Sequence, residues 1–141
     1  MFDSLSAPNK LDNLNSLFRN TRKNTESICE PLAIEDYVVQ PSTSVSPPKW
    51  HLGHCSWFFE EMVLAKYDST YKCMDQNYFQ IFNSYYKSLG DHWAQGNRGQ
   101  LSRPTVGEIF EYRKQITQKV SNLILSGNLC EEAEFIITAG T

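Results

Sequence analysis

The sequence predicts an all-α fold, a bundle of helices with one long crossover connection from residue 30 to residue 48. Four segments of the chain repeat apolar residues at the 3.6-residue period of an amphipathic α-helix. The one cluster of β-branched residues, at Val38 and Val39, is too short to form a sheet. Four of the six prolines lie between residues 30 and 48, where they favour extended or turning backbone over helix.

The first two helices flank this crossover. Residues 10–29 carry an apolar stripe that includes Leu14 and Phe18. The second helix is expected to begin at Pro48 with Ser46 as its N-cap, because proline suits the first helical position and serine caps free backbone N–H groups. It runs to about Lys66 and is apolar over most of its circumference, so we expect it near the centre of the bundle.

The helices of the second half are marked by their ends. Residues 78–89 form a third helical segment that Gly90 should stop. A polar loop then leads to Thr105 and Glu108, whose T-x-x-E spacing is a capping box and predicts a fourth helix. We expect Gly127 to end that helix.

A last helical pattern starts at Asn128, which with Glu131 resembles another capping box. We expect this helix to begin near Leu129 and to be cut short at Thr141, after about three turns. Short helices are marginal in water unless they dock, so residues 139–141 are expected to fray.

Composition indicates one soluble domain over residues 1–141, since 40% of the residues are hydrophobic and 21% are charged. A formal charge of -3 gives no basic excess for nucleic acid, so no nucleic-acid partner is expected. No apolar run is long enough to span a membrane, and residues 1–10 carry no signal-peptide pattern. We therefore predict a cytoplasmic protein without a membrane partner.

The four cysteines are scattered and form no CxxC pair, so we expect free thiols that are mostly small buried hydrophobes. Cys55 follows His54 directly. Neighbouring residues on a helix diverge by about 100°, so these two do not make a nucleophile–base pair. The sequence thus predicts no catalytic nucleophile.

His51 and His54 are the densest chemical feature, because residues at i and i+3 share one face of a helix. Imidazole is a common metal ligand, but two partly buried histidines that bond to neighbouring groups would give the same pattern. His92, with Glu60 and Glu61, completes the set of further candidate ligands. Even with these residues, a three-ligand site looks incomplete.

Arg98 and Arg103 lie in the loop that precedes the fourth helix. Arginine is suited to hold a carboxylate through two parallel hydrogen bonds, so the pair is a candidate substrate-binding clamp. Two solvated surface arginines are the equally simple alternative.

Several longer motifs resemble one known family, the iron-dependent sulfoxide synthases of ergothioneine biosynthesis (the EgtB and OvoA family). They lie at residues 29–37, 46–54, 57–60, 82–86 and 98–105. The resemblance covers essentially residues 15–141 and corresponds to the N-terminal region of those enzymes. It implies a DinB-like four-helix bundle with a long crossover.

The resemblance also implies a chemistry for the intact enzymes. Non-haem Fe(II), held by three histidines, uses O2 to join the sulfur of γ-glutamylcysteine or cysteine to the imidazole of hercynine, as a sulfoxide. The family's Trp-x-Leu-x-His pattern falls on Trp50, Leu52 and His54, which makes His54 the metal ligand. His51 is not counted as a ligand. Arg98 and Arg103 are the arginines left to bind the thiol substrate's carboxylate.

Two departures from the family pattern matter. The other iron ligands lie in an HxxxHxE motif on the last bundle helix, and this chain reaches Thr141 where that motif should begin. The C-terminal domain related to formylglycine-generating enzymes is absent as well, so this fragment is expected to be inactive. His92 and Gln95 stand where arginines are expected.

Two other hypotheses about the function stay open. One is a stand-alone DinB-like module that binds a thiol or a metal, or serves as an interaction domain. The other is a DinB-like thiol transferase, but those enzymes also use a three-histidine metal site.

Overall fold

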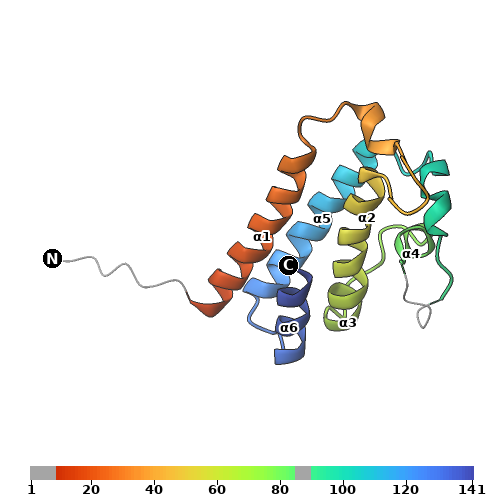
Figure 1. The fold of residues 1–141 in the computed structure, drawn as a ribbon. Coiled ribbons are helices and arrows are strands. Elements are labelled where there is room, and N and C mark those ends of the chain that lie inside the picture. Colours follow the sequence, from red (N-terminus) through yellow and green to blue (C-terminus); the bar gives the residue numbers. More distant parts are fainter. Residues whose placement is uncertain (1–8, 85–89) are drawn as a thin grey trace.

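The computed structural model describes residues 9–84 and 90–141, and within these ranges the chain is helical without a strand. The bundle helices are α1 (Lys10–Cys29), α2 (Pro48–Phe59), α5 (Val106–Leu125) and α6 (Glu131–Gly140) (Figure 1). Helix α2 continues through a π-helical turn, η2 (Glu60–Leu64), into the short α3 (Ala65–Tyr67). The predicted all-α bundle is confirmed.

The crossover is confirmed as well. Residues 30–47 connect the end of α1 to the start of α2 and contain one short 3-10 helix, η1 (Ile34–Val38). Helices α2 and α5 both start at the end of the bundle where α1 finishes, and α6 packs near the opposite end (Figure 1). Helix α4 (Asn77–Phe82) and the 3-10 helix η4 (Gln95–Gln100) lie outside this bundle, beside α2.

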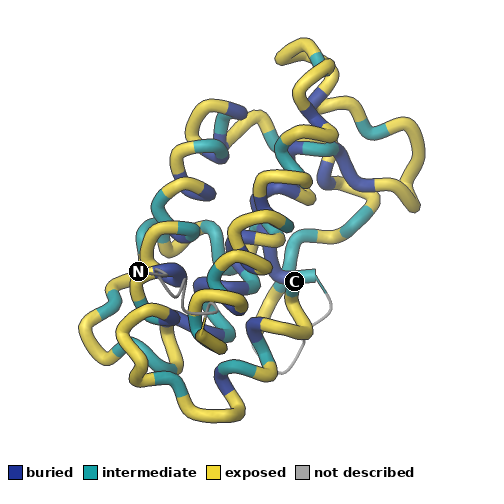
Figure 2. Tube along the Cα trace, turned by 90° about the vertical axis from the view of Figure 1, so that its left-hand side faces the viewer, coloured by how far each residue is buried: buried dark blue, intermediate teal, exposed yellow. Residues whose placement is uncertain are grey.

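Two apolar clusters form the core, and the buried residues face inward between the helices (Figure 2). The first joins the four bundle helices and η2 through Phe18, Phe59, Val63, Ile116 and Ile137, all buried. The second lies between α2, α4 and the start of α5. Its members include Trp50, Trp57, Phe82 and Ile109. The second cluster forms one wall of the site described below.

The capping prediction for α5 is confirmed. The Thr105 hydroxyl accepts a hydrogen bond from the Glu108 backbone at 3.2 Å, and the Glu108 carboxylate accepts one from the Thr105 backbone at 2.6 Å. Gly127 follows the helix with φ +75°, a conformation that L side chains rarely adopt. Sequence signals thus fix both ends of this helix.

Three predicted helix boundaries differ. Pro47, not Ser46, is the N-cap of α2, and Pro48 is its first residue as expected. Helix α6 begins at Glu131 rather than near Leu129, since its N-cap is Cys130. The third segment is helical only to Phe82, because Asn83 adopts an extended conformation with ψ 125°. The rest of that prediction, residues 85–89, lies outside the described residues.

The prediction that most cysteines are buried is wrong. Only Cys29 is buried, whereas Cys55, Cys73 and Cys130 are exposed. Cys55 shares the outward row of α2 with His51, while Leu52 and neighbouring residues turn toward the bundle. Helix α2 is therefore not buried all round, although its sequence is apolar on most sides.

Two buried arginines cross-link the bundle. Arg113 is fully buried on α5, and its guanidinium donates to the Leu52 carbonyl at 3.0 Å and to Glu26 at 3.1 Å. Arg22 on α1 donates to the Ser56 hydroxyl at 2.7 Å. Burial and the charge of Arg113 lower the pKa of Arg22 to about 9, so the Arg22 side chain remains a cation at neutral pH. These bonds tie α1, α2 and α5 together.

No helix in the described part of the chain combines the length and the apolar character that a membrane crossing requires.

Candidate functional site

His54 lies between two indole rings of its own helix. The ring of Trp50 is stacked on it with centroids 4.8 Å apart and planes inclined by 8°, and Trp57 lies on the other side at 5.6 Å and 23°. The three residues follow at spacings of four and three along α2, so their side chains share one face. Because both tryptophans are buried, the imidazole is held in one plane.

The hydrogen bond of His54 defines its tautomer. Nδ1 lies 2.7 Å from the backbone carbonyl oxygen of Phe82. A carbonyl can only accept, so Nδ1 carries the proton and Nε2 keeps its lone pair. Burial lowers the pKa of His54; the Phe82 bond raises it and the charge of Arg98 lowers it further. The result is a neutral imidazole with one nitrogen available to a ligand.

The carbonyl of Phe82 is available because α4 ends there, and the last carbonyls of a helix lack partners within it. The position of Phe82 depends on Gly53, which precedes His54 on α2. A Cβ at Gly53 would lie 2.3 Å from the Phe82 ring, closer than real Cβ atoms approach. Glycine at this position therefore allows the close contact between α2 and α4 that orients His54.

Arg98 completes the stack from η4. Its side chain is buried, its guanidinium carbon lies 3.4 Å from the centroid of a Trp50 ring, and Nη1 donates to the Ser46 hydroxyl at 2.9 Å. This is a close cation–π contact. The solvated-surface alternative is thus excluded for Arg98. The order of groups is guanidinium, Trp50, His54, Trp57.

Arg98, Trp50 and His54 line a pocket of about 380 Å³ between the crossover, the start of α2 and η4. Its lining includes His54, His51, Arg98, Ser46 and Gln95. His51 is exposed, and its ring packs edge-on against Trp50 at 5.5 Å. Burial on the pocket side and the charge of Arg98 lower the pKa of His51. The pocket therefore offers imidazole nitrogens beside a fixed cation and several hydroxyl and amide groups.

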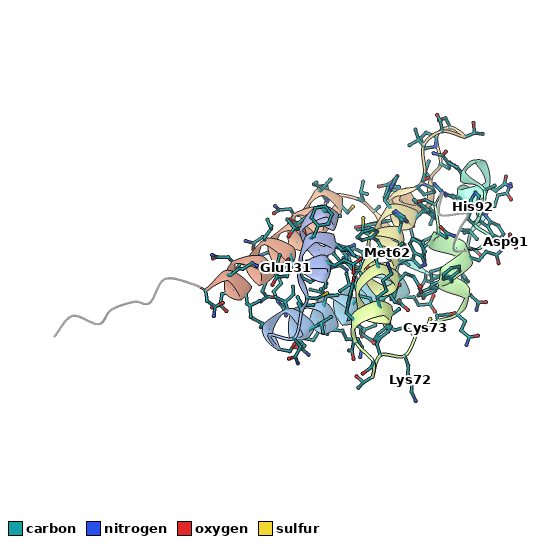
Figure 3. All side chains as sticks on the ribbon, turned by 90° about the horizontal axis from the view of Figure 1, so that it is seen from below. Met62, Lys72, Cys73, Asp91, His92 and Glu131 are labelled. Atoms are coloured by element: carbon teal, nitrogen blue, oxygen red, sulfur yellow. The ribbon has the colours of Figure 1, made fainter. Side chains whose placement is uncertain are left out.

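The other predicted residues lie elsewhere. Arg103 is exposed and lines a pocket beside α4 that Arg98 does not reach. Both arginines line a smaller pocket next to Trp50, so the clamp stays a prediction. His92 lies at the outer edge of the molecule beside Asp91 (Figure 3), outside the His54 pocket. Glu61 is half-buried on η2. Residues 9–84 and 90–141 contain no group of three or more histidine, cysteine or acidic side chains that could hold a metal ion.

Glu60 is not a pocket residue but part of a buried polar cluster. Its carboxylate accepts hydrogen bonds from the Tyr112 hydroxyl and, at 3.4 Å, from the backbone of Met74. It lies on the π-helical turn, a feature that often marks functional segments. Sequence reasoning named Glu60 only as a possible metal ligand. Cys73, which directly precedes Met74, is exposed on the connection after α3 (Figure 3).

Comparison with protein families decides the classification. The model of the DinB superfamily matches residues 17–133. The chain belongs to the DinB superfamily. The match extends from α1 into α6, and it includes His54, Arg98 and Arg103. No curated protein sequence matches this DinB chain closely enough to count as a relative.

Proposed function

We propose that this DinB domain is the iron-site domain of a non-haem Fe(II), O2-dependent sulfoxide synthase, one that joins hercynine to γ-glutamylcysteine or cysteine. The observation that carries the proposal is the bond between His54 Nδ1 and the Phe82 carbonyl, which leaves Nε2 as a ligand atom. The Trp50-x-Leu52-x-His54 motif and the DinB fold support the assignment.

The residues present fit one edge of an iron site. Imidazole nitrogen is a good ligand for iron, and metal-binding histidines commonly donate their other ring N–H to a backbone carbonyl, as His54 does. Bound Fe(II) would supply the chemistry that activates O2. The described residues bring His54 and, beside it, His51 to the pocket, so a three-histidine site requires at least one ligand from elsewhere.

The chain's own residues have separate tasks in this proposal. Trp50 and Trp57 hold the imidazole plane, and the Phe82 carbonyl holds its tautomer. Arg98 supplies a fixed positive charge at the pocket wall, which attracts a substrate carboxylate. Because the guanidinium is already fixed by Ser46 and Trp50, little side-chain entropy is lost when a substrate binds.

The test is anaerobic titration of the purified chain with Fe(II), monitored by calorimetry, and with Co(II) as a spectroscopic probe. We expect weak binding that His54→Ala removes and that His51→Ala leaves largely intact. Tight one-to-one binding lost in both variants would show that His51 completes the site. Metal binding unchanged in His54→Ala would contradict the proposal.

A second candidate is a stand-alone DinB module that binds a thiol or a metal, or another protein, without O2 chemistry. It is favoured by the small number of ligand side chains among the described residues. Titration with γ-glutamylcysteine in the absence of metal distinguishes the two: strong binding that Arg98→Gln abolishes and His54→Ala does not affect would support the module.

A further inference from the structure

A second pocket, of about 390 Å³, lies between α4, the loop before η4 and the start of α5. It shares no lining residue with the His54 pocket. Its size falls in the range of small-molecule sites. Its lining combines aromatic and aliphatic walls with charges of both signs: Tyr78, Ile81, Trp93, Asp75, Glu108 and Arg103.

The aromatic walls are fixed before any ligand arrives. The ring of Tyr78 packs edge-on against Phe82 at 5.4 Å and against Tyr112 at 4.8 Å. Trp93 donates its backbone N–H to the Gln80 carbonyl and its indole N–H to the Asn97 carbonyl, both at 2.9 Å. A ligand that enters between these rings therefore orders few side chains.

The charged groups retain capacity for a ligand. One oxygen of Asp75 accepts from the Asn77 backbone at 2.9 Å, and one oxygen of Glu108 accepts from the Thr105 backbone. The second oxygen of Asp75 accepts no hydrogen bond from the described residues. The Glu108 carboxylate also interacts with the Thr105 side chain. Arg103 donates to the neighbouring Ser102 carbonyl at 3.2 Å, and no carboxylate in the described ranges forms a salt bridge with it.

Both carboxylates act on the pocket. Burial first, and then the charges of Asp75 and Glu108, raise the pKa of Tyr78 to about 12. The bonds from Thr105, with the nearby charge of Arg103, lower the pKa of Glu108, so its carboxylate is ionised at neutral pH. The carboxylates of Asp75 and Glu108 would repel an anion that carries no positive group. The guanidinium of Arg103 would repel a cation that carries no negative group.

We infer that this second pocket binds a small zwitterion of the amino-acid class. Its ammonium group would face Asp75 and Glu108, and its carboxylate would face Arg103. An apolar side chain would lie against Tyr78, Trp93 and Ile81. The inference is independent of the iron site, because no residue of the His54 pocket takes part in it.

The experiment titrates the full chain with L-phenylalanine by calorimetry and by backbone and indole N–H NMR shifts. Two analogues each lack one charge: phenethylamine lacks the carboxylate and 3-phenylpropionate lacks the ammonium. We expect L-phenylalanine to bind about tenfold or more tightly than either analogue, with the largest indole shift at Trp93. Glycine, which lacks the side chain, is expected to bind more weakly.

Charge variants then assign each end of the ligand. Arg103→Gln should weaken L-phenylalanine and 3-phenylpropionate by about tenfold and leave phenethylamine unchanged, whereas Asp75→Asn should weaken L-phenylalanine and phenethylamine. Lys114→Gln and Glu131→Gln remove exposed charges away from the pocket and serve as matched controls. Circular dichroism verifies that each variant is folded.

Three results would overturn the inference. The first is that L-phenylalanine does not bind at millimolar concentration, and the second is that L-phenylalanine, phenethylamine and 3-phenylpropionate bind equally well. The third is that Arg103→Gln weakens the binding of these three ligands to the same extent. Shifts that appear around His54 instead of Trp93 would also exclude this pocket. Because His54→Ala is expected to leave L-phenylalanine binding unchanged, failure here and failure of the iron proposal are observed separately.

Discussion

Replacing Gly53 by alanine tests the link between core packing and the orientation of His54. The added Cβ would lie 2.3, 2.4 and 2.8 Å from three carbons of the Phe82 ring. That ring is only 2% exposed and packs against Tyr78 and Tyr112, so it has little room to move aside. We expect α4 to shift, and the Phe82 carbonyl to move away from His54 with it.

The magnitude follows from three contributions. Overpacking of a well-packed core costs about 1–3 kcal/mol. The higher helix propensity of alanine raises the free energy of unfolding by about 0.8–1 kcal/mol. Weakening the His54–Phe82 hydrogen bond lowers it by about 0.5–1.5 kcal/mol. The free energy of unfolding should therefore fall by about 1–3 kcal/mol. With a urea dependence of about 2 kcal/mol per molar, the midpoint falls by roughly 0.5–1.5 M.

The assay is urea unfolding, with imidazole NMR of His54 as the local readout. Gly107→Ala on α5 is the matched control, because a Cβ added at Gly107 would have no neighbouring atom within 4 Å. That variant should leave the midpoint unchanged or raise it slightly. The double variant Gly53→Ala with Phe82→Leu should show favourable coupling, since the smaller side chain makes room. Equal midpoints for Gly53→Ala and Gly107→Ala would refute the reasoning.

Three further predictions concern buried polar groups and the cap of α5. Tyr112→Phe removes a donor from the buried Glu60 carboxylate and should lower the free energy of unfolding by about 1.5–3 kcal/mol in urea titrations. Arg113→Ala removes the side-chain donors to the Leu52 and Arg22 carbonyls and to Glu26 and leaves a buried cavity, so it should cost about 2–5 kcal/mol, measured in the same way. Glu108→Gln should destabilise the protein at neutral pH but not in acid. The folded-state pKa of Glu108 is below its ordinary value of 4.5, so its contribution is present above that pH and is lost as the pH falls through the lowered pKa. Midpoints measured across this pH range check it.

Much of the fold could be predicted because local signals agree with the tertiary structure. The capping box of Thr105 and Glu108, the proline at the first position of α2 and Gly127 after α5 each act within a few residues. The end of α4 could not be predicted this way. Apolar periodicity continues past Phe82, but Asn83 is buried in an extended conformation, and its side-chain amide donates to the Gly90 carbonyl.

The candidate site was only partly predictable for the same reason. His54 could be named from its motif, since the ligand and its stacking partners lie on one helix. The burial of Arg98 depends on a loop that folds back onto Trp50, and no local pattern encodes that contact. One signal was available for Arg113: a charged residue on the apolar stripe of α5 indicates a cation buried with partners rather than one in solvent.

Helix α2 shows why an apolar pattern alone is ambiguous at a site. Trp50 and Trp57 belong to the second apolar cluster by burial, yet the same rings hold the plane of His54. Their packing therefore contributes to stability and to ligand geometry at once. A substitution that preserves only the buried volume, such as Trp50→Leu, should retain the fold better than the His54 geometry, because an aliphatic side chain offers no flat surface for the imidazole or for the Arg98 guanidinium. Loss of metal binding in Trp50→Leu that exceeds its loss of stability would demonstrate this double role, whereas parallel losses would assign Trp50 to the core alone.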